Sequence, residues 1–367
     1  MDFNKKKRLA FLLSVPILAL VITICAWKRS PSIAADNTSL RYMGRIGHSS
    51  GASIMYWSGS SVTMNFKGTS VKAVLKDEKG DNYYYVIVDS NRITKLKADS
   101  GKKDYELVSG LPDANHTIQL YKLTDISKGK TWFYGFEINH NGQILEPSPV
   151  PSRKIEFYGN SITSGYSLED SVGDSRESKF YNNYYSYAAI TARHYGAEFH
   201  CISRSGIGIM VSWCPEIMPE IYDHLDPYDA NSKWDFSQFT PSIVVINLFQ
   251  NDYWLINKPE YSQTKIRFGD KMPNELAIID AYKKFVSSIR EKYPNASIIC
   301  TLGSMDATAE GSPWPGYIKT AVAQLDDKKM FTHFFPFRNS PGHPKKKEQQ
   351  ENAESLMKFI DESVGFK

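Results

Sequence analysis

The chain has 367 residues, of which 41% are hydrophobic, 23% charged and 13% aromatic, and this composition excludes a disordered or collagen-like protein. The formal net charge of +4 comes from residues 1–35, which contain six Lys or Arg and one Asp; the remainder has 38 basic and 39 acidic residues. A nearly neutral chain without a concentrated basic face gives no electrostatic reason to expect nucleic-acid binding.

Residues 1–35 have the pattern of an export signal. The cluster Lys5–Arg8 precedes an unbroken apolar run, Leu9–Trp27, and the segment Ser32–Ala35 is rich in small residues. The run exceeds the ~7–15 residues of an ordinary signal-peptide core and reaches the ~17–25 that span a bilayer. We therefore expect a cleaved signal peptide or an N-terminal membrane anchor, and in either case an exported chain that is secreted, periplasmic or anchored at the cell surface.

From residue 40 to residue 146 the pattern has a period of two. Apolar and polar residues alternate in Val62–Phe66 and Val71–Leu75, and turn residues such as Lys79–Asn82 separate the runs. This period indicates strands, and no helical stretch interrupts them. The spacing is typical of an antiparallel sandwich, so residues 40–146 are predicted to form an all-β jelly-roll or sandwich domain.

Residues 147–152 contain three prolines, which can continue neither a helix nor a central strand, and we interpret them as a linker. In residues 153–367 short apolar runs such as Ile155–Tyr158 alternate with helical patterns such as Glu275–Lys292. This βαβ succession predicts an α/β domain with a mostly parallel sheet. Reactive side chains are then expected on loops beyond the carboxyl ends of the strands.

Four such loops each contain a residue suited to acyl transfer. Ser161 follows the first strand, where a turn would expose its hydroxyl as a nucleophile, and Gly206 would let its backbone N–H approach a ligand. Asn251 could donate an N–H to developing negative charge, and His343 could accept the proton of Ser161. Each motif alone also fits an ordinary turn or cap. Their order along one predicted sheet edge favours a catalytic site.

These four loops resemble the sequence blocks of the SGNH (GDSL-type) hydrolase superfamily. The matching residues are Gly159–Ile162, Gly206, Asn251–Asp252 and His343–Pro344, in that order. Most of the chain is similar to carbohydrate esterase family two, which includes acetyl xylan esterases. The similar segments are Tyr42–Gly47, Val62–Leu75, Val108–Thr117 and Lys154–Ile162.

The resemblance implies an N-terminal jelly-roll followed by an SGNH-hydrolase domain. It implies a serine esterase that removes O-acetyl groups from polysaccharides or oligosaccharides through an acyl-enzyme. By the same resemblance Ser161 is the nucleophile and His343 the base. The backbone N–H groups of Ser161 and Gly206 and the side chain of Asn251 form the oxyanion hole.

The chain departs from the family pattern beside the histidine. SGNH enzymes usually have Asp two or three residues before it, where this chain has Ser340 and Pro341. We therefore expect a Ser-His dyad in which a backbone carbonyl, and neither Asp252 nor Asp306, orients the imidazole of His343. Such a site would catalyse the same reaction with a lower turnover, because the base and the oxyanion hole remain.

Two further departures are Asn160, where the family commonly has Asp, and Phe249, where it has Gly. They predict an oxyanion loop of different shape. Together with the missing acid they motivate one alternative function, a non-catalytic carbohydrate-binding protein with a decayed site. An O-acetyltransferase that uses the same acyl-enzyme is a second alternative. Retention of all four block residues favours the esterase.

Aromatic residues near the loops are expected to bind the apolar face of a sugar. The predicted substrate-binding residues are Trp213, Tyr253, Trp254 and Trp314, for each of which core packing is the alternative. No spacing of His, Asp, Glu or Cys suggests a metal, and no motif suggests a cofactor. The expected partner is an acetylated carbohydrate, and the chain is expected to be a monomer.

Overall fold

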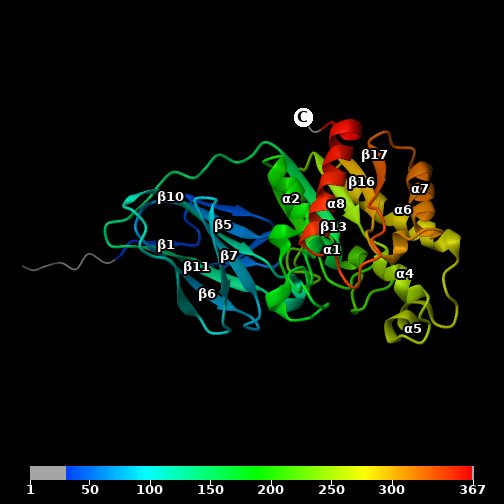
Figure 1. Ribbon diagram of the computed structural model, residues 1–367, viewed down its shortest axis with the longest axis horizontal. Helices are drawn as coiled ribbons and strands as arrows, with labels where there is room; N and C mark the ends of the chain where they lie inside the picture. The colour runs from blue at the N-terminus through cyan, green and yellow to red at the C-terminus, as the bar shows by residue number, and fades with distance from the viewer. Residues whose placement is uncertain (1–29, 366–367) are drawn as a thin grey trace, which may run out of the picture.

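The computed structural model describes residues 30–365 (Figure 1). Antiparallel strands, drawn in blue to teal, form the first part of the chain, and a parallel sheet flanked by helices forms the second. Within this described range, no helix combines the length and the apolarity that crossing a bilayer requires. The apolar run Leu9–Trp27 lies outside the described residues, so the export segment stays a prediction.

The N-terminal part is a sandwich because alternate residues of its strands face one shared core. Val62, Met64 and Phe66 of β5 are fully buried, and β6 on the facing sheet buries its alternate residues in the same way. This confirms the predicted antiparallel sandwich; the jelly-roll connectivity stays a prediction. One sheet contains β3 (Ile46–Ser49), β4 (Ala52–Met55), β11 (Thr131–Ile138), β6 (Val71–Asp77) and β9 (Lys103–Val108), and the other β12 (Gln143–Ile144), β5 (Ser61–Gly68), β10 (Ala114–Lys122), β7 (Tyr83–Val88) and β8 (Arg92–Lys97).

The sandwich begins earlier than predicted. Strand β1 (Ser32–Ala34) pairs with β11, and β2 (Leu40–Met43) pairs with β5. Ile33 and Ala35 are buried in the core between the sheets. The last residues of the predicted leader therefore belong to the folded domain, and cleavage after Ala35 would remove a strand.

The C-terminal part is built on five parallel strands in the order β14, β13, β15, β16, β17. It confirms the predicted parallel sheet, and the irregular residues 145–153 join it to the sandwich. The first strand, β13, lies inside the sheet with β14 on one side and β15 on the other, so the winding reverses beside it. Ligands bind at such a point, outside the carboxyl ends of the strands. The strands are β13 (Lys154–Gly159), β14 (Glu198–Ser203), β15 (Ile243–Asn247), β16 (Ser297–Leu302) and β17 (Met330–Phe334).

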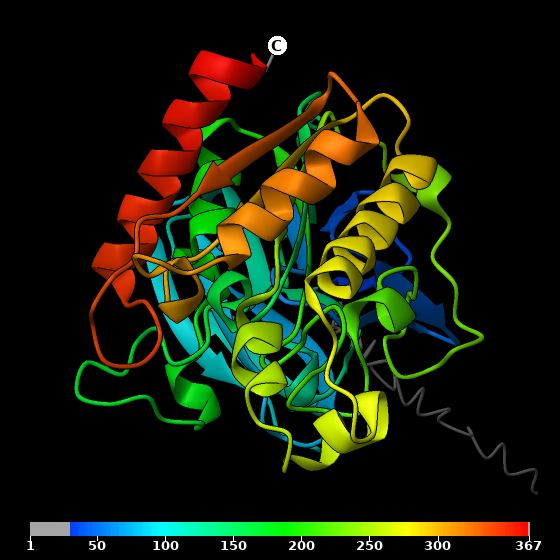
Figure 2. The same ribbon diagram turned by 90° about the vertical axis from the view of Figure 1, so that its right-hand side faces the viewer.

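Helices cover both faces of this sheet (Figure 2). Helix α6 has its predicted bounds, because Asn274 caps its start and Ile278, Tyr282 and Phe285 place an apolar stripe on the sheet. The helices α2 and α8 pack together on the opposite face. The helices are α1 (Ser161–Ser164), α2 (Tyr187–His194), α3 (Met218–Ile221), α4 (Gln250–Ile256), α5 (Ser262–Phe268), α6 (Glu275–Lys292), α7 (Trp314–Leu325) and α8 (Lys346–Phe359).

A fully buried cation joins the sandwich to the α/β domain. Arg45, just before β3, donates from Nη1 to the carbonyl oxygens of Tyr222 (2.6 Å) and His224 (3.1 Å). From Nη2 it donates to Glu156 Oε1 (3.0 Å) and to the Tyr158 hydroxyl (3.2 Å). Burial would raise the pKa of Glu156, but the charge of Arg45 and the surrounding donors lower it to about 2. The two domains therefore share one buried ion pair.

Candidate active site

Ser161 is the first residue of α1, directly beyond the carboxyl end of β13. Its side chain reaches a cleft of about 700 Å³ at this edge of the sheet. Asn160 caps the helix, since its side-chain oxygen accepts the N–H of Ile162 at 3.0 Å. Asn and Asp make the same cap, so the departure at Asn160 retains this function.

The imidazole of His343 lies between Ser161 and a carboxylate. His343 Nε2 is 2.8 Å from Ser161 Oγ, and Nδ1 is 2.8 Å from Oδ2 of Asp174. The backbone N–H of His343 also donates to Asp174 Oδ1 at 3.2 Å. A carboxylate can only accept, which places the imidazole proton on Nδ1 and leaves Nε2 to accept from the serine. The prediction that a backbone carbonyl orients the imidazole is therefore wrong.

Asp174 is the functional residue that the sequence did not reveal. It lies in the irregular segment 171–177 between α1 and the short helix η2 (Ser178–Phe180), at no fixed spacing from His343. Burial would raise its pKa, but the hydrogen bonds and charge of His343, with Lys345 nearby, hold the pKa below its usual range. The only sequence signal is an acid in the loop after the nucleophile.

Asp252 and Asp306, the two acids considered from the sequence, have partners other than His343. Asp306 Oδ2 accepts the indole N–H of Trp254 at 2.9 Å. Asp252 is buried and accepts the backbone N–H groups of residues 209–211 at 2.6 to 3.1 Å. Burial raises the pKa of Asp252 to about 6 even though these N–H groups lower it. Asp252 thus shapes the loop that follows Gly206.

The predicted oxyanion-hole residues meet at the same cleft. Gly206 has φ +85°, and a Cβ there would lie 3.0 Å from Cβ of Trp213, so both the backbone conformation and the close contact favour glycine. Asn251 is buried in the first turn of α4, and its Nδ2 donates to the Ile207 carbonyl at 2.7 Å. An amide nitrogen has two N–H donors, and this bond engages one of them. Ser161, Gly206, Asn251 and His343 all line the cleft.

Phe249 takes the conformation that glycine adopts freely. Its φ is +85° and its ψ is −14°, a left-handed backbone that is strained in a bulky residue. Its ring is fully buried, with ring centroids 4.8 Å from Tyr282 and 5.0 Å from Trp314. Packing therefore offsets the strain, and the chain enters α4 through a turn that a glycine would also make.

Of the four aromatic residues predicted to bind substrate, some line the cleft and others pack in the core. Trp213, which is 38% exposed, and Trp254 line the cleft. Trp314 is buried, and Tyr253 packs on it with perpendicular rings. Trp314 is thus a core residue, and the prediction that it binds substrate is wrong. Tyr253 is not among the residues that line the cleft, whose further aromatic walls are Tyr166, Tyr181 and Tyr261.

The cleft is built for proton transfer and charge stabilisation by side chains and backbone. The Tyr166 ring lies 4.5 Å from the imidazole of His343 between ring centroids and forms one wall beside it. Within residues 30–365, no group of three or more His, Cys, Asp or Glu is arranged to hold a metal ion. A serine hydrogen-bonded to an imidazole, itself hydrogen-bonded to a carboxylate, is the arrangement of an activated nucleophile.

Comparisons with known proteins identify relatives of this chain. The profile of the carbohydrate esterase 2 N-terminal domain matches residues 42–149. A family two carbohydrate esterase from Clostridium thermocellum, whose structure is a complex with cellohexaose, is 32% identical with a TM-score of 0.79, over 89% of this chain and 100% of that one. This relative matches both domains.

Two curated relatives extend the comparison. The cellulase/esterase CelE of Acetivibrio thermocellus is 36% identical over 348 residues, which are 90% of this chain and 40% of that protein. The chain therefore spans less than half the length of CelE. An acetylxylan esterase / glucomannan deacetylase of Cellvibrio japonicus is 23% identical over 89% of each chain.

Proposed function

This chain belongs to carbohydrate esterase family two, and from that premise we propose that it hydrolyses O-acetyl esters of polysaccharides or oligosaccharides as a serine esterase. One observation carries the proposal: Ser161 Oγ, the imidazole of His343 and the carboxylate of Asp174 are linked by two contacts of 2.8 Å. The proposal replaces the expected Ser-His dyad by a triad.

In the acylation step Ser161 Oγ attacks the acetyl carbonyl while His343 Nε2 accepts the serine proton. The carbonyl oxygen becomes an oxyanion, which the backbone N–H groups of Ser161 and Gly206 and the amide of Asn251 stabilise. The carboxylate of Asp174 stabilises the imidazolium formed at the same moment. His343 then protonates the departing sugar oxygen, and an acetyl-serine remains.

In the deacylation step water replaces the sugar. His343 accepts a proton from the water as it attacks the acetyl carbon, and the same donors stabilise the second oxyanion. Collapse releases acetate and returns the proton from His343 to Ser161 Oγ. Only side chains and backbone groups of this chain take part, so the proposal needs no cofactor.

The carbohydrate part of the proposal is supported by relatives and by the cleft. The Clostridium thermocellum esterase binds cellohexaose in its structure, and the Cellvibrio japonicus relative is an acetylxylan esterase / glucomannan deacetylase. The cleft of this chain has Trp213 and Trp254 in its walls, and the faces of such rings match the apolar face of a sugar. We further propose that the chain is exported and that its sandwich has jelly-roll connectivity.

The test is hydrolysis of 4-nitrophenyl acetate and of acetylated xylan by the purified chain. Ser161→Ala and His343→Ala should each lower turnover about 10³-fold or more, and the double variant should be little worse than either single one, because the two residues act as a unit. Acetylation of Ser161, detected by mass spectrometry after a rapid quench, would support the covalent step.

Two outcomes would favour the alternatives. If the chain binds cello-oligosaccharides and releases no acetate, it is a non-catalytic carbohydrate-binding protein. If acetate release is slow in water and an added sugar acceptor becomes acetylated faster, it is an O-acetyltransferase. Near-wild-type turnover in His343→Ala would contradict the assigned base.

A further inference from the structure

Asp174 orients the imidazole from a loop that needs external support. The loop projects from the domain: Val172 is 96% exposed, and the Asp174 side chain is 35% exposed. It contains no helix or strand of its own between α1 and η2. Exposed loops with few buried contacts sample several conformations unless polar contacts hold them.

The α/β domain holds the first half of the loop. The carboxylate of Asp170 accepts the backbone N–H groups of Val172 (3.1 Å), Gly173 (3.0 Å) and Ser175 (2.9 Å). The ammonium of Lys345 donates to the carbonyl of Gly173 at 2.8 Å. These contacts hold the chain at residues 172–175, on both sides of Asp174.

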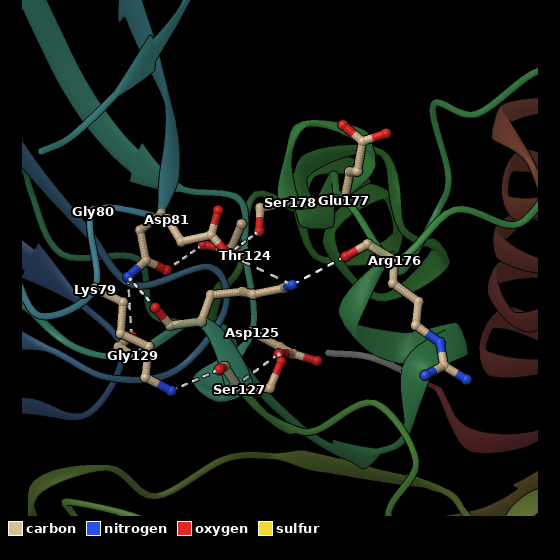
Figure 3. Close-up of polar contacts among 12 residues, drawn as sticks. Lys79, Gly80, Asp81, Thr124, Asp125, Ser127, Gly129, Arg176, Glu177 and Ser178 are labelled. Atoms are coloured by element: carbon tan, nitrogen blue, oxygen red, sulfur yellow. Dashed lines mark hydrogen bonds and ion pairs between the residues drawn. The ribbon is translucent and has the colours of Figure 1, made fainter.

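The sandwich domain holds the second half. Lys128 Nζ donates to the carbonyl of Arg176 at 3.0 Å, two residues after Asp174. Asp81 Oδ2 accepts from Ser178 Oγ at 2.5 Å, and Figure 3 shows these two side chains beside Arg176. Lys128 and Asp81 are themselves 3.6 Å apart as an ion pair. The loop that carries the acid is therefore fastened on its C-terminal side by residues of the other domain.

Hydrogen bonds within the sandwich domain fix the backbone position of Lys128. It ends the short helix η1 (Ile126–Lys128), where Asn82 Nδ2 donates to the carbonyls of Lys128 and Gly129 at 3.1 Å each. At the start of η1, Asp125 Oδ2 accepts the backbone N–H of Ser205 at 2.8 Å, directly before Gly206. One element of the sandwich thus contacts both the acid loop and the oxyanion loop.

We propose that Lys128, paired with Asp81, is a positioning residue that holds the acid loop so that Asp174 meets His343. Lys128 acts through the Arg176 carbonyl and takes no part in proton transfer. The sandwich domain would then contribute directly to the reaction, as the support of the triad acid. The kinetic part of the proposal rests on the proposed esterase function.

The test substitutes Lys128 by Met, which retains the apolar stem and removes the donor. Losing one hydrogen bond that holds a loop should lower kcat about tenfold. The effect cannot exceed the ~10⁴-fold cost of neutralising the triad acid itself. The kcat–pH profile should move toward that of Asp174→Asn, and Lys128→Arg should restore most of the rate. Ser178→Ala should act in the same direction.

The matched control is Lys130→Met. Lys130 lies on the same connection, pairs across the domain interface with Asp226 at 2.7 Å, and lines a different pocket from the cleft with the triad. Its loss should leave kcat unchanged. A fall in kcat equal to that of Lys128→Met would overturn the proposal, because any weakened interface would then have the same effect.

Combination with Asp174→Asn separates positioning from direct substrate contact, since Lys128 also lines the cleft. If Lys128 acts through Asp174, Lys128→Met should not lower kcat further in the Asp174→Asn background. Multiplicative losses, or a change confined to KM, would overturn the proposal.

A measurement without substrate separates this proposal from the esterase function. In ¹⁵N-histidine-labelled full chain, the low-field proton signal of His343 Nδ1–H should be present, absent in Asp174→Asn, and weakened or broadened in Lys128→Met. This result would support Lys128 as a positioning residue even if acetyl esters were not hydrolysed. An unchanged signal in Lys128→Met would overturn it, whatever the activity.

Discussion

Arg45 and Lys128 are two of the cations through which the sandwich domain contacts the α/β domain, and they differ in their surroundings. Arg45 is fully enclosed, donates four hydrogen bonds and pairs with the equally buried Glu156. Lys128 lies at the edge of the cleft with 17% of its side chain exposed, and its ammonium holds one carbonyl of a loop. Both side chains carry a positive charge and donate hydrogen bonds across the same interface between the domains.

The comparison indicates that burial determines whether such a contact controls the stability of the fold or the position of a single loop. An uncompensated charge in a buried site costs several kcal/mol, so removing one partner of the Arg45 pair should act on folding. A partly exposed hydrogen bond has a net worth of only about 0.5–1.5 kcal/mol, which hardly affects global stability. The same small energy can shift where Asp174 lies, because the loop is exposed and only polar contacts such as this one hold it in place.

The largest expected effect lies at the cleft. Asp174→Asn should lower kcat about 10⁴-fold, because the amide neither stabilises the imidazolium nor fixes the required tautomer. Urea unfolding should stay close to wild type, since the side chain is partly exposed. If kcat on 4-nitrophenyl acetate fell only a few-fold, Ser161 and His343 would act as a dyad, and the position of the Asp174 loop would not matter for the reaction.

Arg45→Met should lower the free energy of unfolding by about 3–5 kcal/mol, because it leaves Glu156 buried without its cation. Turnover per folded molecule should change little. The double variant Arg45→Met, Glu156→Gln is the matched control and should recover much of the loss. Urea denaturation measures the stability, and kcat is measured at low temperature, where the variant stays folded. A fall in kcat with unchanged stability would contradict the structural role of Arg45.

Asn251→Ala sharpens the cleft side of the comparison. Removing one oxyanion donor should lower kcat about 10²–10³-fold with little change in KM. The side chain also donates to the Ile207 carbonyl, so urea unfolding of Asn251→Ala should be compared with wild type to show that the loop and fold are kept. An effect on KM alone would make Asn251 a substrate-positioning residue.

Acid should act on the buried contact. Because the folded pKa of Glu156 is lowered to about 2, its pairing stabilises the fold above pH ~4.5, and this stability is lost as the pH falls toward 2. The loss can reach about 3 kcal/mol. In Arg45→Met the unpaired carboxyl should make acidification stabilising in the same range. Unfolding curves between pH 5 and about pH 2.5 that show equal slopes for both proteins would contradict the assignment.

Trp213→Ala should have the smallest effect. The ring borders the cleft and packs on Tyr261 with centroids 5.0 Å apart, and it contacts no triad residue. Loss of a stacking surface should raise KM for xylan-derived oligosaccharides by about 5- to 10-fold, with kcat on 4-nitrophenyl acetate unchanged. A fall in kcat on the small ester would show that Trp213 positions Gly206 and does not merely bind sugar.

The fold was predictable where local pattern and tertiary packing agree. The period of two from Val62 to Leu75 predicted facing strands, and the helix Glu275–Lys292 has its expected bounds because its cap and its apolar stripe are both local. β1 was missed because a short strand beside an apolar leader has no period of its own. The pairing partner in β11 is about a hundred residues away.

The site was predictable to the same extent. Ser161, Gly206 and Asn251 each follow a strand of one parallel sheet, so strand order alone brings them to one edge. Trp314 was misassigned because flanking prolines look like a loop, whereas its burial depends on Phe249 and Tyr253 from another segment. A sequence pattern shows that an aromatic residue is present and does not show which surface it meets.

The sequence by itself determined the sandwich, the parallel sheet and the family resemblance. It also predicted Ser161, Gly206, Asn251 and His343 as residues of one site, and the structure brings them to one cleft. Hydrophobic period and chain order carry that information. Only the tertiary structure decided which acid faces His343, because Asp174 is 169 residues away along the chain and reaches it through a loop with no motif. The same is true of Lys128: a hydrogen bond between a side chain and a carbonyl of another domain leaves no trace in spacing or periodicity, since any residue has the carbonyl.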